Sequence, residues 1–219
     1  MKIKYVMLFL TGIFLIYLHT GCDSLPTPPT CVDTSNVIAD KPNIYIYPIS
    51  STNLSVNIQF PVGGNIIESI PEYGNGWNVS VEPNGLINNE FGYLFYECSI
   101  PNLFQKENGW IIKREDLLAF FDDNLSVSGF NTTEKKDFID YWIPKLTDSN
   151  YYEIYPQYNY DIEKTIVLNF SQIPDNIFRL FYVIKGRENN NLKLTEPKIE
   201  TGKREGFYVM EWGVIYRFL

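Results

Sequence analysis

Histidine is the scarcest functional residue in this chain: His19 is the only one in 219 residues. It lies within residues 1–21, which have the pattern of a cleaved export signal, so the expected mature chain has no histidine. Imidazole is the base that activates Ser-His-Asp and Cys-His nucleophiles, and it is a ligand in the HExxH metalloproteases and in most catalytic zinc sites. These enzyme classes are therefore excluded for the mature chain.

Short catalytic and nucleotide-binding motifs are missing as well. The sequence has no Ser-x-x-Lys, no Gly-x-Ser-x-Gly, no phosphate-binding loop, no Gly-x-Gly-x-x-Gly and no EF-hand calcium loop. The short oxygen-rich run Asp122-Asp123-Asn124 is expected to mark a helix end rather than a calcium site. We therefore predict no metal site and no cofactor.

Basic residues are outnumbered by acidic ones. The chain has 18 Lys and Arg against 26 Asp and Glu, a formal charge of −8. Removal of residues 1–21 takes away Lys2 and Lys4 and no acid, which leaves 16 basic side chains and a charge of −10. Because phosphate backbones repel such a domain, we do not expect a nucleic-acid partner.

The N-terminus resembles a bacterial lipoprotein signal. Lys2 and Lys4 precede an apolar run over residues 5–18, and His19-Thr20-Gly21-Cys22 follows. A helix needs about 20 apolar residues to span a bilayer, so this run predicts a cleaved signal rather than a permanent span. We expect lipidation of Cys22 to anchor the exported protein in the cell envelope, with the membrane as its partner. Simple cleavage and an uncleaved anchor remain as alternatives.

Composition predicts one globular domain behind a tether. Residues 22–40 contain a Pro- and Thr-rich stretch of the kind that stays extended, and we interpret them as a lipidated spacer. Residues 41–219 show no internal repeat and no second boundary, and their length suits a single core. Besides Cys22 there are two cysteines, Cys31 and Cys98, which either form a disulfide or are unrelated small residues.

The hydrophobic pattern predicts an α+β fold. Apolar residues alternate with a period of two from residue 43 onward and again after residue 151, which is typical of strands. Between them, residues 115–121 and a stretch beginning with the capping sequence Asn131-Thr132-Thr133-Glu134 have helical spacing. Residues 185–203 are polar and are predicted to form a loop. We expect a mainly antiparallel sheet or sandwich, a meander in its first half, with a helix pair inserted near the middle.

Four segments resemble a family of bacterial proteins over residues 41–216. They are Lys41-Pro42-Asn43-Ile44-Tyr45-Ile46-Tyr47-Pro48, Tyr93-Leu94-Phe95-Tyr96-Glu97, Asp137-Phe138-Ile139-Asp140-Tyr141-Trp142-Ile143-Pro144 and Gly206 through Gly213, which contains Glu211-Trp212-Gly213. The family pattern has Trp at the position of Tyr96 and Gly at the position of Val214. No activity is assigned to the family, so the resemblance implies no function.

Two glutamates are the candidate catalytic residues. Strand alternation places Glu97 at the end of an apolar row and Glu211 at the end of another, so the two could face each other across a cleft. A glycosidase needs such a pair of carboxyl groups, because one donates a proton while the other attacks the sugar or activates water. The alternative is that Arg179 forms a semi-buried ion pair with one of them, which is a structural role.

The tryptophans and Arg179 are the candidate ligand-binding residues. Trp77, Trp110 and Trp212 would be sugar platforms if exposed, although aromatic residues at alternating strand positions more often belong to the core. Asp137 and Tyr141, four residues apart on the second predicted helix, would either bind a ligand or face solvent.

Two functional hypotheses follow. The favoured one is a binding or structural module, tethered to the envelope, that recognises a carbohydrate, peptide or protein partner. The alternative is a carboxylate-dependent hydrolase such as a glycosidase, centred on Glu97 and Glu211. The hydrolase requires their carboxyl groups to lie roughly 5–9.5 Å apart.

Overall fold

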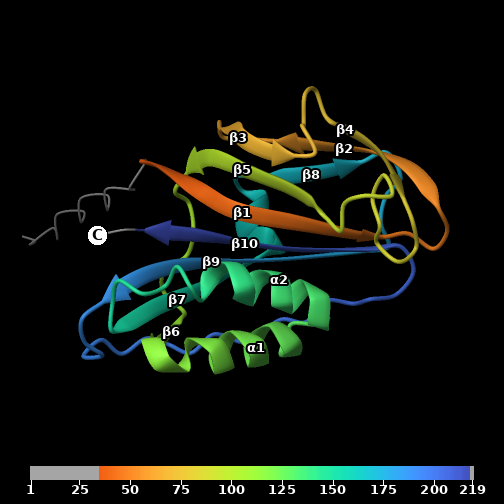
Figure 1. Ribbon diagram of the computed structural model, residues 1–219. Coiled ribbons are helices and arrows are strands. Elements are labelled where there is room, and N and C mark those ends of the chain that lie inside the picture. Colours follow the sequence, from red (N-terminus) through yellow and green to blue (C-terminus); the bar gives the residue numbers. More distant parts are fainter. Residues whose placement is uncertain (1–34, 218–219) are drawn as a thin grey trace, which may run out of the picture. The chain divides into compact units, whose positions relative to one another are not determined.

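The computed structural model describes residues 35–217, which belong to one compact unit, Asp33–Leu219. Two sheets and a helix pair form three layers (Figure 1). The predicted α+β class is confirmed, with a mainly antiparallel β structure and helices near the middle of the chain. Residues 1–34, which include the predicted signal, Cys22 and Cys31, lie outside the described residues.

The central layer is a seven-stranded sheet. Its order is β3 (Asn65–Ile70), β5 (Leu94–Pro101), β1 (Asn36–Tyr47), β10 (Tyr208–Arg217), β9 (Asn176–Arg187), β7 (Tyr151–Tyr158) and β6 (Trp110–Lys113). All neighbours are antiparallel except β9 and β10, which run parallel. β1 begins at Asn36, before the predicted domain start at residue 41, so part of the expected spacer is a strand of the sheet.

The second layer is a three-stranded antiparallel sheet. Its order is β4 (Trp77–Val81), β2 (Thr52–Gln59) and β8 (Val167–Phe170). The predicted meander is therefore wrong, because β1 and β2 follow each other in the chain but belong to different sheets. β1 instead pairs with β5 and β10.

The third layer is helical. A 3₁₀ turn, η1 (Arg114–Asp116), leads into α1 (Leu117–Val127), and α2 (Thr132–Trp142) follows. Asn131 accepts a hydrogen bond from the Glu134 backbone N–H and the Glu134 carboxylate accepts one from the Asn131 N–H, so the predicted capping box is present. A short helix, α3 (Asn159–Glu163), connects β7 to β8.

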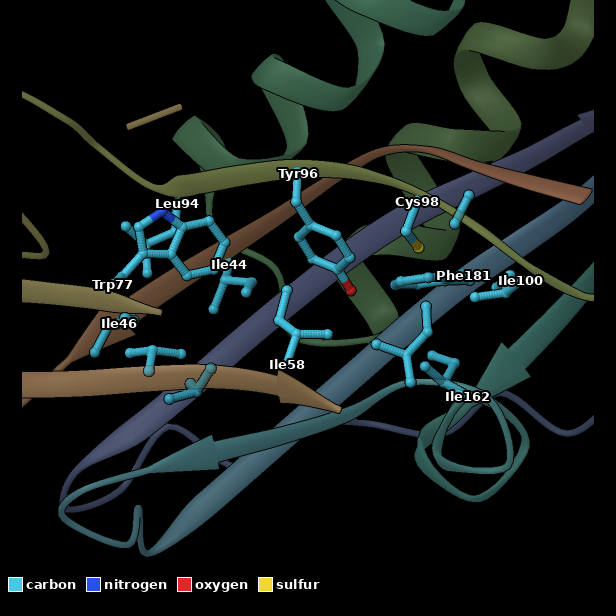
Figure 2. Packing of buried hydrophobic residues seen from close by; sticks show 14 of the residues in the cluster. Ile44, Ile46, Ile58, Trp77, Leu94, Tyr96, Cys98, Ile100, Ile162 and Phe181 are labelled. Atoms are coloured by element: carbon cyan, nitrogen blue, oxygen red, sulfur yellow. The ribbon is translucent and has the colours of Figure 1, made fainter. Parts of the chain in front are cut away.

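The central sheet buries a core on each face. One core lies between the two sheets, and Figure 2 shows the labelled side chains of β1, β2, β4 and β5 meeting there, with Phe181 of β9. The other lies between the sheet and the helix pair and is built largely from aromatic rings, including Phe121, Phe138, Tyr182 and Trp212. Strand alternation decides which core receives each side chain.

Candidate functional site

The two candidate glutamates lie on opposite faces of the central sheet. In β5, Tyr96 points into the core between the sheets, so Glu97 points to the helix side. Glu211 of β10 points into the core between the sheets, where its Oε1 accepts a hydrogen bond of 2.8 Å from the Tyr96 hydroxyl. The predicted carboxylate pair is therefore not formed, because the sheet separates the two groups.

Glu211 instead belongs to a buried ion pair. Its Oε2 accepts a hydrogen bond from Nε of Arg179, and both side chains are almost fully buried. Arg179 Nη1 also donates to the Ile166 carbonyl oxygen at 2.6 Å. The ion-pair alternative is what the structure shows, and it removes Arg179 from the candidate ligand-binding residues.

Two of the three candidate tryptophans are core residues. Trp77 is 2% exposed and donates its indole N–H to the Pro71 carbonyl oxygen. Trp212 is fully buried and donates to the Glu134 carbonyl oxygen at 3.1 Å. Only Trp110 is partly accessible, and its ring packs on Phe120 with centroids 5.2 Å apart. The favoured interpretation, that these tryptophans belong to the core, holds for Trp77 and Trp212, and their burial removes them from the candidate ligand-binding residues.

Cys98 is fully buried in the core between the sheets, where burial raises the pKa of its thiol. Its proposed disulfide partner, Cys31, lies outside the described residues, so the disulfide stays a prediction.

A cleft of about 430 Å³ opens beside the N-terminal half of α2, and we call it the tyrosine cleft. Its volume lies in the range of small-molecule sites. Three of the four segments that resemble the bacterial family contribute lining residues: the first gives Tyr45 and Tyr47, the second Tyr93 and the third Asp137. The fourth segment contains Trp212, whose ring packs on Tyr45. Its lining residues are Tyr45, Tyr47, Asn84, Gly85, Leu86, Gly92, Tyr93, Asn131, Thr133 and Asp137.

The tyrosines of the cleft are held by carboxylates on α2. The Tyr45 hydroxyl donates to Asp137 Oδ2 at 2.9 Å, and the Tyr47 hydroxyl donates to Glu134 Oε1 at 2.6 Å. The ring of Tyr93 meets Tyr45 edge-on at 5.4 Å. Burial raises the pKa of Tyr45, Tyr93 and Asp137, so both tyrosines remain protonated donors at neutral pH.

Asn43 lies behind the tyrosines of the cleft. It is fully buried, and it lies on the same face of β1 as Tyr45 because the two are separated by one residue. Its amide is a hydrogen-bond partner of the Tyr45 and Tyr93 hydroxyls and lowers their pKa values against the larger effect of burial. Asn43 does not itself line the cleft; it supports two of the tyrosines that do.

Lys41 lies near the cleft, over the ring of Tyr93. Its ammonium lies 4.1 Å from the ring centre of Phe95, 5.4 Å from that of Tyr93 and 5.3 Å from that of Tyr141. No carboxylate of the described residues lies within 4.0 Å of it, and burial lowers its pKa. Its backbone has φ +57° at a β-bulge, a conformation that is strained for a residue with a side chain.

Glu97 has the most perturbed carboxyl group near this site. Burial, followed by a hydrogen bond with Asp40 and repulsion by Asp40 and Glu68, raises its pKa to about 7. Tyr141 of α2 lies beside the same acids, with its hydroxyl 3.5 Å from Asp40 Oδ1. Burial and these charges raise the pKa of Tyr141 to about 12. Glu97 thus neighbours the cleft as part of an acid cluster, not as half of a catalytic pair with Glu211.

The sequence pattern marks Asp137 and Tyr141 as candidates but not Tyr45, Tyr47 and Tyr93, which line the cleft. Period-two alternation predicts that Asn43, Tyr45 and Tyr47 share one face, which was the available signal. It does not predict that α2 covers only part of that face and leaves a cleft.

Comparisons with protein-family models, with curated proteins and with solved structures returned no match. Within residues 35–217, no helix has the length and apolarity needed to cross a membrane.

Proposed function

We propose that the protein is an exported lipoprotein of the bacterial cell envelope whose domain binds a small polar ligand in the tyrosine cleft. Lipid on Cys22 would hold it to the membrane, and strand β1 would follow directly after the tether. The proposal is for a binding module, and the hydrolase alternative receives no support from a pair of glutamates that the sheet separates.

The hydroxyl groups of Tyr45 and Tyr93 beside the Asp137 carboxylate carry this proposal. All three side chains line the cleft, and the Tyr45 hydroxyl donates to Asp137 Oδ2 at 2.9 Å. A ligand group that both donates and accepts, such as a hydroxyl or an amide, matches this set of hydroxyl and carboxylate oxygens. Partly desolvated polar groups of this kind give a site its specificity, because a ligand without the matching group leaves them unpaired.

Charge in the cleft is already balanced by protein groups. Glu134 is fully buried and forms a bidentate pair with Arg204, whose guanidinium stacks over Tyr47 and Tyr208. Lys41 lies near Asp137 and offsets part of its charge. These pairings favour a neutral ligand over a strongly charged one.

The test is a thermal-shift screen of the soluble domain against neutral mono- and oligosaccharides and short peptides. We expect at least one hydroxyl- or amide-bearing compound to raise the melting temperature of the wild type and not that of Tyr93→Phe, which removes a hydroxyl from the cleft lining. Tyr160→Phe, at an exposed tyrosine, is the matched control and should keep the shift. A shift of equal size in Tyr93→Phe, or no shift with any compound, would contradict the proposal.

A further inference from the structure

The outer face of the three-stranded sheet is polar and carries no charge. The outward positions of the three strands are Asn53, Ser55, Asn57 and Gln59 in β2, Asn78 and Ser80 in β4, and Val167 and Asn169 in β8. Ser171 follows β8, and Asn88 reaches over β4 from the loop that leads to β5. We call this surface the amide face.

The absence of charge on this face is unusual for the chain. Lys, Arg, Asp and Glu make up 20% of the sequence, yet none of them occupies an outward strand position here. Exposed strands, and edge strands above all, ordinarily carry charges that prevent association. Both β4 and β8 are edges of this sheet.

Hydrogen bonds within the face fix the orientation of its amides. The Ser55 hydroxyl donates to Asn78 Oδ1 at 2.6 Å, and the Ser80 backbone N–H donates to Asn88 Oδ1 at 2.9 Å. The oxygen of each of these two amides accepts a hydrogen bond within the face, so its NH₂ group can still donate hydrogen bonds to a ligand. Asn53 makes no side-chain hydrogen bond with any other residue in the described range, so it presents a donor and an acceptor.

These groups line a shallow groove of about 400 Å³. It is lined by Asn53, Leu54, Ser55, Asn78, Val79, Ser80, Asn88 and Ser171. Neighbouring strands lie about 4.8 Å apart, and outward residues on one strand lie about 6.7 Å apart. The face is therefore a grid of amides and hydroxyls at a spacing comparable to the width of one sugar ring.

We infer that the amide face is a second binding site, separate from the tyrosine cleft, for a neutral polysaccharide chain. Such a chain offers hydroxyl and ether oxygens along its length and no charge, which matches free amide donors on an uncharged surface. The amides of Asn78 and Asn88, which hydrogen bonds within the face hold in place, lose little side-chain entropy on binding. A charged polymer would find no counter-charge on this face.

The test measures retention of the soluble domain on cellulose, mannan, starch and alginate. Two variants, Asn53→Asp and Asn78→Asp, replace exposed amides with carboxylates of the same shape, and Asn78→Asp keeps the acceptor for Ser55. Asn190→Asp adds the same charge in an exposed loop, and Tyr93→Phe alters the lining of the tyrosine cleft. Circular dichroism confirms that each variant is folded.

We expect at least one neutral polysaccharide to retain the wild type, Asn190→Asp and Tyr93→Phe. We expect Asn53→Asp and Asn78→Asp to bind it at least tenfold more weakly. Retention by none of the neutral polymers, or retention that survives both carboxylates, would overturn the inference. Loss in Tyr93→Phe alone would assign the binding to the cleft, and preference for alginate would show that charge rather than the amide face directs it.

Discussion

At the scale of single residues, the Arg179–Glu211 ion pair explains two side chains that also fit a catalytic interpretation. Removal of one partner leaves a buried charge, so we expect Arg179→Met to lower the free energy of unfolding by about 3–5 kcal/mol. Replacement of both partners, Arg179→Met with Glu211→Leu, should recover most of that loss because no charge remains buried. Urea unfolding of the two single variants and the double variant measures this coupling. Additive losses would show that the two side chains do not act as a pair.

Glu97 gives the domain a pH-dependent stability. Its pKa is raised from an ordinary value of 4.5 to about 7 in the folded protein, so the folded state holds the proton more tightly than the unfolded state. Its stabilising contribution is therefore fully present below about pH 4.5 and is lost as the pH rises through about 7.

We expect Glu97→Gln to raise stability at pH 8 relative to the wild type and to flatten the dependence between pH 5 and pH 8. Urea midpoints at these two pH values test this expectation. Glu107→Gln, an exposed loop carboxylate, is the control and should follow the wild type. A Glu97→Gln variant with the wild-type pH dependence would place the titration elsewhere.

At the scale of elements, Arg204 attaches the long segment between β9 and β10 to the N-terminus of α2. It donates to both carboxylate oxygens of Glu134, which is fully buried, and to the Gly129 carbonyl oxygen. Loss of Arg204 leaves the Glu134 charge unpaired at the helix cap. We expect Arg204→Met to lower the free energy of unfolding by about 2–3 kcal/mol. It should also speed proteolytic cleavage within residues 188–207. Lys203→Met, an exposed neighbour, should change neither quantity.

The sequence predicted local elements better than their partners. The capping box at Asn131 follows from a short-range rule, and it is confirmed. The pairing of β1 with β10 joins residues at the two ends of the domain, and alternation carries no information about such pairing. Within each strand, alternation correctly predicted which residues share a face with Glu97 and with Glu211. It could not show that the two glutamates point to opposite faces of the central sheet, because that depends on how the two strands are placed in the sheet.

At the scale of the whole molecule, the three-layer arrangement places the two proposed binding surfaces on different layers. The tyrosine cleft lies where the helix layer ends over β1, and the amide face forms the outer surface of the small sheet. The core between the two sheets separates the amide face from the central sheet, so a substitution on one surface should leave binding at the other unchanged.

Lipidation of Cys22 would hold the tyrosine cleft and the amide face close to a membrane. We expect the full-length protein expressed in bacteria to incorporate labelled palmitate and to partition into detergent. Cys22→Ser should abolish both, and Cys98→Ser should leave both unchanged. Incorporation of label by Cys22→Ser would contradict the lipoprotein assignment.

The proposed function depends most directly on the hydroxyl groups that line the tyrosine cleft, and one substitution tests it. Tyr93 lines the cleft, and its ring packs edge-on against Tyr45 at 5.4 Å. Tyr93→Phe removes the hydroxyl and keeps the ring, so we expect it to lose the ligand-induced thermal shift while its free energy of unfolding in urea stays within about 1 kcal/mol of the wild type. Tyr160→Phe, at an exposed tyrosine, should keep both the stability and the shift. A thermal shift of wild-type size in Tyr93→Phe would contradict the proposal, and the tyrosine cleft would lose its main support as a binding site.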